Sequence, residues 1–197
     1  MHRVTTLSID CGGGGIKASV LDDAGTMRAH PIRVPTPYPL TTDLFVQTLV
    51  DLAASLPAAE RVTVGLPGMI RHGVVVTTPH YVTRSGPRSR VLPELVEQWE
   101  GFDAQTALQT ALGLPTRVLN DAEVHGAGVV SGVGLELVLT LGTGLGCAIY
   151  DGGRLALLAK AHAAKGDGEA SVNAWRNVCE LGFEPSAESC DSSRSGR

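Results

Sequence analysis

Four consecutive glycines separate the carboxylate of Asp10 from the ammonium group of Lys17: Gly12, Gly13, Gly14 and Gly15. Without side chains, a glycine backbone can approach phosphate oxygens closely and offer N–H groups to them. Asp10 is a candidate Mg²⁺ ligand, since this ion is usually held by one or two carboxylates together with phosphate and water. The spacing is not that of a P-loop. The segment predicts a phosphate site, with a plain glycine-rich hairpin turn as the alternative.

A second glycine turn has the same design. Gly142, Thr143 and Gly144 stand between two apolar runs, 135–141 and 145–150. The hydroxyl of Thr143 adds a donor for a phosphate oxygen. A structural tight turn explains this short string equally well, but two such turns could together clamp a polyphosphate from two sides.

Two further segments end short apolar runs with polar or turn residues. Asn120 and Asp121 follow the run 115–119, and a carboxylate at the carboxyl end of a strand lies where ligands enter open α/β sheets. Asp121 could accept the proton of a sugar hydroxyl that attacks phosphorus, and Asn120 could bind a neighbouring hydroxyl. The alternative is that the pair only caps the next helix.

The other segment is a Pro-Gly turn after the run 61–66. Its candidate cleft-lining residues are Gly65, Pro67 and Gly68. A rigid turn at this place can line a small-ligand cleft, although locally it is also simply a good turn.

These segments need a scaffold, and the pattern of the chain predicts an α/β fold. An antiparallel meander of three strands over 4–10, 16–21 and 26–34 is followed by strands that alternate with helices. The helices are expected over 42–56, 103–112 and 122–130. The polar stretch 80–90 reads as a surface loop, and with 4% aromatic residues the core should consist of aliphatic side chains.

Composition narrows the function classes. A net charge of −4 argues against a nucleic-acid partner, and no apolar run reaches the roughly 18 residues of a membrane span. The chain reaches Asp10 too early for a secretory signal. No C-x-x-C pair occurs among the four cysteines, so we expect a reduced, cytoplasmic protein: Cys11, Cys147, Cys179 and Cys190.

Taken in order, the four segments resemble the ROK family (repressors, open-reading-frame proteins and sugar kinases), most closely its polyphosphate-dependent glucokinase branch. Residues 10–17 resemble the D-x-G-G-[ST]-x-[IT]-K phosphate motif, with Gly14 in place of the usual Ser or Thr. Residues 65–75 resemble G-x-P-G-x-[VI]-x-H-G-x-[VI], residues 118–122 resemble V-x-N-D-A, and residues 139–146 resemble L-T-L-G-T-G-[IL]-G. The resemblance covers about residues 4–155.

The resemblance implies a ribonuclease-H-like lobe of the actin-like ATPase fold, with Asp121 as catalytic base and Mg²⁺ bound with ATP or inorganic polyphosphate. It also implies that Gly65, Pro67 and Gly68 lie beside the sugar pocket. Beyond Leu155 the match fails, because the family's E-x-x-H sugar segment has no counterpart. The family's C-x-C-G-x-x-G-C zinc motif has no counterpart either, so no zinc is expected. We therefore expect a lobe over 1–155, a divergent, partly disordered tail over 156–197, and a second lobe that is largely absent. A truncated or frame-disrupted gene would explain why the family match stops after residue 155.

The sequence and the resemblance support two alternative functions. The first is a glucokinase-like kinase that transfers a phosphoryl group to the 6-hydroxyl of a hexose. The second is a catalytically impaired phosphate- or nucleotide-binding remnant or interaction module. A repressor is disfavoured, since no helix-turn-helix precedes residue 10. If strands 135–150 normally pack against a further lobe, the chain should form a homodimer or otherwise self-associate.

Overall fold

The computed structural model describes residues 4–141 and 145–156 of the chain. The chain forms two compact units, Met1–Val124 and His125–Arg197, which are described separately. The expected second phosphate turn, 142–144, and the expected tail from residue 157 lie outside the described residues. Among the described residues, every helix is too short or too polar to cross a membrane.

The first unit is built on a five-stranded sheet with strand order β3-β2-β1-β4-β7. Its strands are β1 (Thr6–Cys11), β2 (Ile16–Leu21), β3 (Ile32–Val34), β4 (Arg61–Leu66) and β7 (Thr116–Asn120). β1, β2 and β3 form the predicted antiparallel meander, whereas β4 and β7 continue the sheet in parallel with β1. β3 is shorter than predicted, because Pro31 has no N–H group for a strand ladder.

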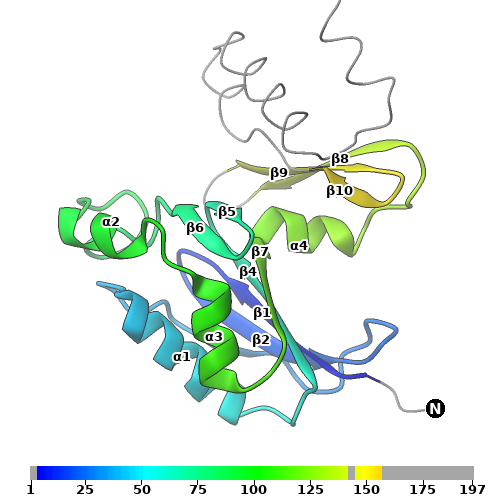
Figure 1. Ribbon diagram of the computed structural model, residues 1–197, viewed down its shortest axis with the longest axis horizontal. Coiled ribbons are helices and arrows are strands. Elements are labelled where there is room, and N and C mark those ends of the chain that lie inside the picture. Colours follow the sequence, from blue (N-terminus) through cyan, green and yellow to red (C-terminus); the bar gives the residue numbers. More distant parts are fainter. Residues whose placement is uncertain (1–3, 142–144, 157–197) are drawn as a thin grey trace, which may run out of the picture. The chain divides into compact units, whose positions relative to one another are not determined.

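Helices α1 (Thr42–Ala54) and α3 (Ala104–Leu112) pack together on one face of this sheet (Figure 1). The side chains of Thr41 and Asp103 cap them by accepting hydrogen bonds from backbone N–H groups, as expected of Thr and Asp before a helix. α3 ends at Gly113, whose φ of 66° is left-handed. Both helices were predicted from these signals.

The chain between the helices contains elements that the sequence pattern did not predict fully. β5 (Met69–Arg71) and β6 (Val74–Thr77) form a hairpin after the Pro-Gly turn, and the short helix α2 (Pro93–Trp99) was not anticipated. The indole N–H of Trp99 donates to the carbonyl oxygen of Leu40 at 2.8 Å, which fixes α2 to the start of α1.

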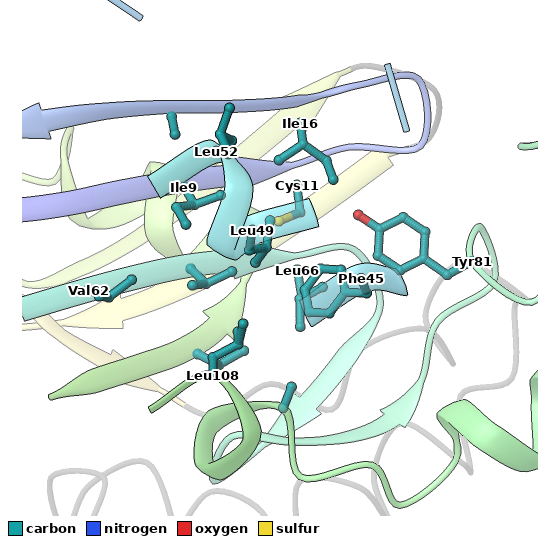
Figure 2. Packing of buried hydrophobic residues seen from close by; sticks show 14 of the residues in the cluster. Ile9, Cys11, Ile16, Phe45, Leu49, Leu52, Val62, Leu66, Tyr81 and Leu108 are labelled. Carbon is teal, nitrogen blue, oxygen red and sulfur yellow. The ribbon is translucent and has the colours of Figure 1, made fainter. Parts of the chain in front are cut away.

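The core of the first unit lies between the sheet and the two helices (Figure 2). Aliphatic side chains of β1, β2 and β4 dominate it, as predicted, but four of the few aromatic rings gather there too, with neighbouring centroids 5.2 to 6.1 Å apart: Phe45, Tyr81, Trp99 and Phe102. The prediction of a purely aliphatic core was therefore wrong.

The second unit contains a three-stranded antiparallel sheet with strand order β10-β9-β8. Its strands are β8 (Leu135–Leu141), β9 (Leu145–Asp151) and β10 (Arg154–Ala156), and helix α4 (Asp121–Ala127) leads into it. Ala148 and Tyr150 are buried on one face, where Gly126 of α4 contacts the ring of Tyr150. Alternate residues of β8 expose a row of leucines, here called the β8 leucine row: Leu135, Leu137, Leu139 and Leu141.

Candidate active site

The carboxyl ends of three parallel strands bring the predicted site residues of the first unit to one edge of the sheet. Asp10 of β1 is aligned with Gly65 of β4, and Leu66 of β4 is aligned with Asn120 of β7. Because the carboxyl ends of parallel strands form the ligand-binding edge of open α/β sheets, this edge is the candidate active site.

Asp10 lies on the sheet face opposite to α1 and α3. Its neighbours Ile9 and Cys11 are buried in the core, and successive residues of a strand point to opposite faces. The Asp10 carboxylate is 37% exposed and lies 3.7 Å from the ammonium group of Lys17 on β2. A carboxylate and a cation therefore stand side by side at the start of the glycine loop.

Gly65 separates Asp10 from the beginning of α4. A Cβ atom at Gly65 would lie 3.3 Å from the Cα atom of Asp121 and 3.5 Å from a methyl group of Val124. The absence of a side chain thus allows the first turn of α4 to approach β4 closely. This contact places Asp121 beside the strand position that pairs with Asp10.

The side chain of Asn120 joins the Pro-Gly turn to the start of α4. Asn120 is 1% exposed, and its amide nitrogen donates to the carbonyl oxygens of Gly68 at 2.7 Å and Leu66 at 3.3 Å. The same nitrogen lies 2.8 Å from Oδ1 of Asp121, and its oxygen accepts from the N–H group of Ala122. The amide is therefore fully engaged within the protein, and sugar binding by Asn120 stays a prediction.

A buried glutamate completes the cap of α4. The carboxylate of Glu123 accepts a hydrogen bond from the N–H group of Asn120 at 3.0 Å, three residues earlier. Together with the bond from the N–H group of Ala122 to the Asn120 side chain, this bond caps the first turn of α4 in a variant of the capping box. Asn120 therefore caps α4, as the alternative interpretation predicted. The same side chain also holds Asp121 in place.

Asp121 keeps one carboxylate oxygen available. Its Oδ1 atom accepts from the amide of Asn120 and from the N–H group of Ala122. Its Oδ2 atom makes no hydrogen bond to the part of the chain that the structure describes, and the residue is only partly buried. This arrangement orients the carboxylate while leaving an oxygen for an incoming proton.

The Pro-Gly turn requires glycine at position 68. Gly68 has a φ of 120°, and a Cβ atom there would collide with the backbone of Thr77 and Thr78. Pro67 precedes it between β4 and β5. The hydroxyl of Thr78 is buried in this region without a hydrogen-bond partner among the described residues.

The glycine loop is held by side chains that sequence reasoning missed. The hydroxyl of Thr36 donates to the carbonyl oxygen of Gly12 at 2.7 Å, and the hydroxyl of Tyr38 donates to that of Gly13 at 3.0 Å. The guanidinium group of Arg33 donates to the carbonyl oxygen of Gly14 at 3.1 Å. A signal did exist, because prolines alternate with Thr36 and Tyr38 and favour an extended chain with both side chains on one side.

The stretch 80–90, predicted to be a surface loop, also packs on the site. Tyr81 is fully buried, and a Cβ atom at Gly13 would lie 2.6 Å from the ring of Pro87 and 3.4 Å from the ring of His80. The stretch is a loop of turns and bends, as predicted, but its polar composition hid one buried aromatic anchor, Tyr81.

The ring of Tyr81 extends toward Cys11 beneath the glycine loop (Figure 2). Its hydroxyl has no geometrically satisfactory hydrogen-bond partner among the described residues. Burial raises the pKa of the Cys11 thiol, and the negative charges of Asp10 and Asp121 raise it further.

The structure therefore gathers the predicted residues of the first unit at one edge, whereas the second phosphate turn lies outside the described residues. The gathered residues are Asp10, Gly12, Gly13, Gly14, Gly15, Lys17, Gly65, Pro67, Gly68, Asn120 and Asp121.

Comparison with known proteins identifies the family of this site. The family model described as "ROK family" matches residues 6–168. The chain belongs to the ROK family. The resemblance of its motifs is thereby confirmed.

Individual relatives agree with this assignment. The chain is 31% identical over 156 residues to the polyphosphate glucokinase of Mycobacterium tuberculosis (strain CDC 1551 / Oshkosh), which covers 75% of this chain and 53% of that protein. The crystal structure of the inorganic polyphosphate/ATP-glucomannokinase from Arthrobacter sp. strain KM superposes with a TM-score of 0.65 at 32% identity, covering 80% of this chain and 62% of that one.

A ROK family glucokinase from Streptomyces griseus, solved in complex with glucose and AMPPNP, gives a TM-score of 0.61 at 25% identity, with 77% of this chain and 46% of that chain covered. These neighbours confirm the predicted mixed α/β, actin-like ATPase fold. The ROK chain spans about half the length of the curated relatives that it matches.

Proposed function

We propose that this ROK protein transfers a phosphoryl group from ATP or inorganic polyphosphate to the 6-hydroxyl group of a glucose-like hexose. The observation that carries the proposal is the carboxylate of Asp121, oriented by Asn120 with one oxygen available, on the same sheet edge as the glycine loop. The names of the relatives supply the substrate class, since one is a polyphosphate glucokinase and the other an inorganic polyphosphate/ATP-glucomannokinase.

Asp121 would act as the general base. The sugar hydroxyl oxygen forms a bond to the terminal phosphorus atom, the bond from phosphorus to the bridging oxygen breaks, and the hydroxyl proton passes to the Asp121 carboxylate. Phosphoryl transfer depends mainly on alignment and charge neutralisation, so one base with fixed N–H donors and cations suffices. Lys17 and the glycine loop would neutralise and orient the donor.

The site fits Mg²⁺ bound chiefly by the donor's phosphates and by water. The described residues contain no cluster of three metal-ligating side chains, and Asp10 is a partly exposed carboxylate at the start of the glycine loop. One or two carboxylates are the usual protein share of such a site. Bound there, Mg²⁺ would neutralise charge on the phosphates.

The second candidate is a protein that binds phosphate or nucleotide without turning over sugar. The observation that favours it is the extent of the match, about half the length of the relatives, because complete closure of the active site excludes water and fixes the acceptor. Self-association is proposed for the same chain, supported by the exposed β8 leucine row. The cytoplasmic location and the lack of nucleic-acid and zinc binding stay predictions.

A coupled assay of glucose phosphorylation with MgATP and with inorganic polyphosphate tests the proposal. Asp121→Asn should lower kcat by about 10²- to 10⁴-fold, the range for loss of a general base, while tripolyphosphate binding persists. Asp51→Asn is the matched control, because Asp51 is an exposed carboxylate on α1.

Equal rates for the parent chain and Asp121→Asn would refute the role of Asp121. Tripolyphosphate binding by a parent chain that never phosphorylates sugar would instead favour the second candidate.

A further inference from the structure

Every carbonyl oxygen of the glycine loop already has a hydrogen-bond donor. Those of Gly12, Gly13 and Gly14 accept from side chains of the segment 33–38, and that of Gly15 accepts from the N–H group of Gly12 at 3.0 Å. The loop therefore has no free acceptor that would repel an approaching anion.

Because each peptide unit is planar, a bond that fixes its C=O group also fixes the direction of its N–H group. In a planar trans peptide, the C=O group of one residue and the N–H group of the next point in opposite directions. Thr36 fixes the C=O group of Gly12 and thereby turns the N–H group of Gly13 away from the segment 33–38. Tyr38 and Arg33 do the same for the next two peptide planes.

The N–H groups directed in this way are not used within the protein. Those of Gly13 and Gly14 donate no hydrogen bond to any residue that the structure describes. Successive backbone N–H groups on one side of a turn can form an anion-binding nest. Donation to each carbonyl also polarises its peptide, which strengthens the N–H group as a donor.

The guanidinium group of Arg33 adds charge at the same place. A Cβ atom at Gly15 would lie 2.8 Å from the Arg33 side chain, so the guanidinium group lies directly against the loop. Arg33 is also aligned with Lys17 across β2 and β3. Two cations thus flank the loop beside the single carboxylate of Asp10.

We infer that Arg33, Thr36 and Tyr38 are positioning residues that orient the N–H groups of the glycine loop toward a terminal phosphate of the phosphoryl donor. The inference rests on the proposed function for the identity of the anion, whereas the ordering of the loop is independent of it. Thr36 should contribute most, since it is 8% exposed and makes the shortest bond.

The test compares Thr36→Val and Tyr38→Phe with the parent chain. Thr36→Ser is the conservative variant that restores the hydroxyl group. Thr48→Val is the matched control, since Thr48 donates a similar 2.6 Å bond to the carbonyl oxygen of Leu44 on exposed α1. Calorimetry with tripolyphosphate measures anion binding, and hydrogen–deuterium exchange without ligand measures loop order.

We expect Thr36→Val and Tyr38→Phe to weaken tripolyphosphate binding by about 3- to 10-fold, the effect of one net hydrogen bond. Amide exchange should become faster in a peptide covering residues 12–17 and stay unchanged in peptides from α3. In the coupled assay, KM for the phosphoryl donor should rise while KM for glucose is retained. Thr36→Ser should restore the parent values.

The inference would be overturned if Thr36→Val and Thr48→Val had the same amide exchange rate in the glycine loop and the same affinity for tripolyphosphate. If the parent chain binds no tripolyphosphate, the proposed function fails, and the exchange experiment still decides whether the three side chains order the loop. Tyr38→Phe keeps the test valid if Thr36→Val does not fold, because Tyr38 is only partly buried.

Discussion

The side-chain amide of Asn120 donates a 2.7 Å hydrogen bond to the carbonyl oxygen of Gly68, across 52 positions of sequence. This bond ties the Pro-Gly turn after β4 to the residue that precedes the proposed base. Because the same amide also contacts Asp121, one side chain connects two of the family's motifs.

Asn120→Ala should therefore destabilise the protein by about 2–4 kcal/mol, because it removes several buried hydrogen bonds and leaves backbone carbonyl groups without a donor. Urea unfolding followed by circular dichroism measures this change. Gln47→Ala is the control, because Gln47 bonds Asp51 on the exposed face of α1 and should change stability by about 0.5 kcal/mol or less. Similar losses in both variants would contradict the structural role of Asn120.

Gly14 is the position where this chain departs from the family's phosphate motif. A Cβ atom there meets nothing within 4 Å, and the residue does not need a left-handed backbone. Gly14→Ser should fold normally, gain up to about 1 kcal/mol of stability and bind tripolyphosphate more tightly through its added hydroxyl.

Gly13→Ser is the contrasting variant, since its Cβ atom would lie 2.6 Å from Pro87. We expect it to lower the melting temperature and weaken tripolyphosphate binding in calorimetry. Weaker binding by Gly14→Ser than by the parent chain would show that the loop does not approach phosphate at residue 14.

Tyr38 predicts a pH dependence in the alkaline range. Burial raises the pKa of Tyr38 from 10.0 to about 12, so the unfolded chain loses this proton at a lower pH than the folded protein. The stabilisation is complete below pH 10 and is lost as the pH rises from 10 toward 12. The stability difference between the parent chain and Tyr38→Phe should therefore shrink over this interval.

Urea unfolding at pH 8, 10 and 11 measures this difference, and the absorbance of tyrosinate at 295 nm reports the titration itself. A difference that stays constant from pH 8 to pH 11 would exclude the predicted coupling.

The β8 leucine row predicts concentration-dependent self-association. Leu135 and Leu141 are 75% and 88% exposed, and apolar faces of this kind usually mark an interface. The double variant with Leu137→Lys and Leu139→Lys should shift sedimentation toward the monomer. Val76→Lys, at an exposed valine of β6, should sediment like the parent chain. A parent chain that is monomeric at all concentrations would contradict the prediction.

Local signals predicted much of the first unit. Thr41, Asp103 and Gly113 marked helix ends through backbone chemistry that acts within a few residues, and the alternation of β1 placed Asp10 at a strand end. Strands that alternate with helices predicted an α/β fold, whereas the parallel pairing that brings Asp10, Asn120 and Asp121 to one edge is seen only in the structure.

What the sequence did not reveal depends on contacts between distant segments. The donation from Thr36 to Gly12 spans 24 positions. The prolines beside Thr36 indicate an extended chain, but they do not indicate which segment its hydroxyl contacts. Tyr81 stands in a polar stretch, and only the packing of Phe45 and Trp99 around its ring explains its burial. α2 was missed because its seven residues are too few for a clear helical period.

The contact of Pro87 with Gly13 has a consequence for how such chains can diverge. A residue with a side chain at position 13 requires a smaller or displaced residue at position 87, so the two sites should change together among related sequences. Position 15 should vary in the same paired way with position 33, and position 65 with the first turn of α4. Among related sequences, we expect the side-chain volumes at each pair of positions to vary in opposite directions. A glycine should be retained wherever its large neighbour is retained.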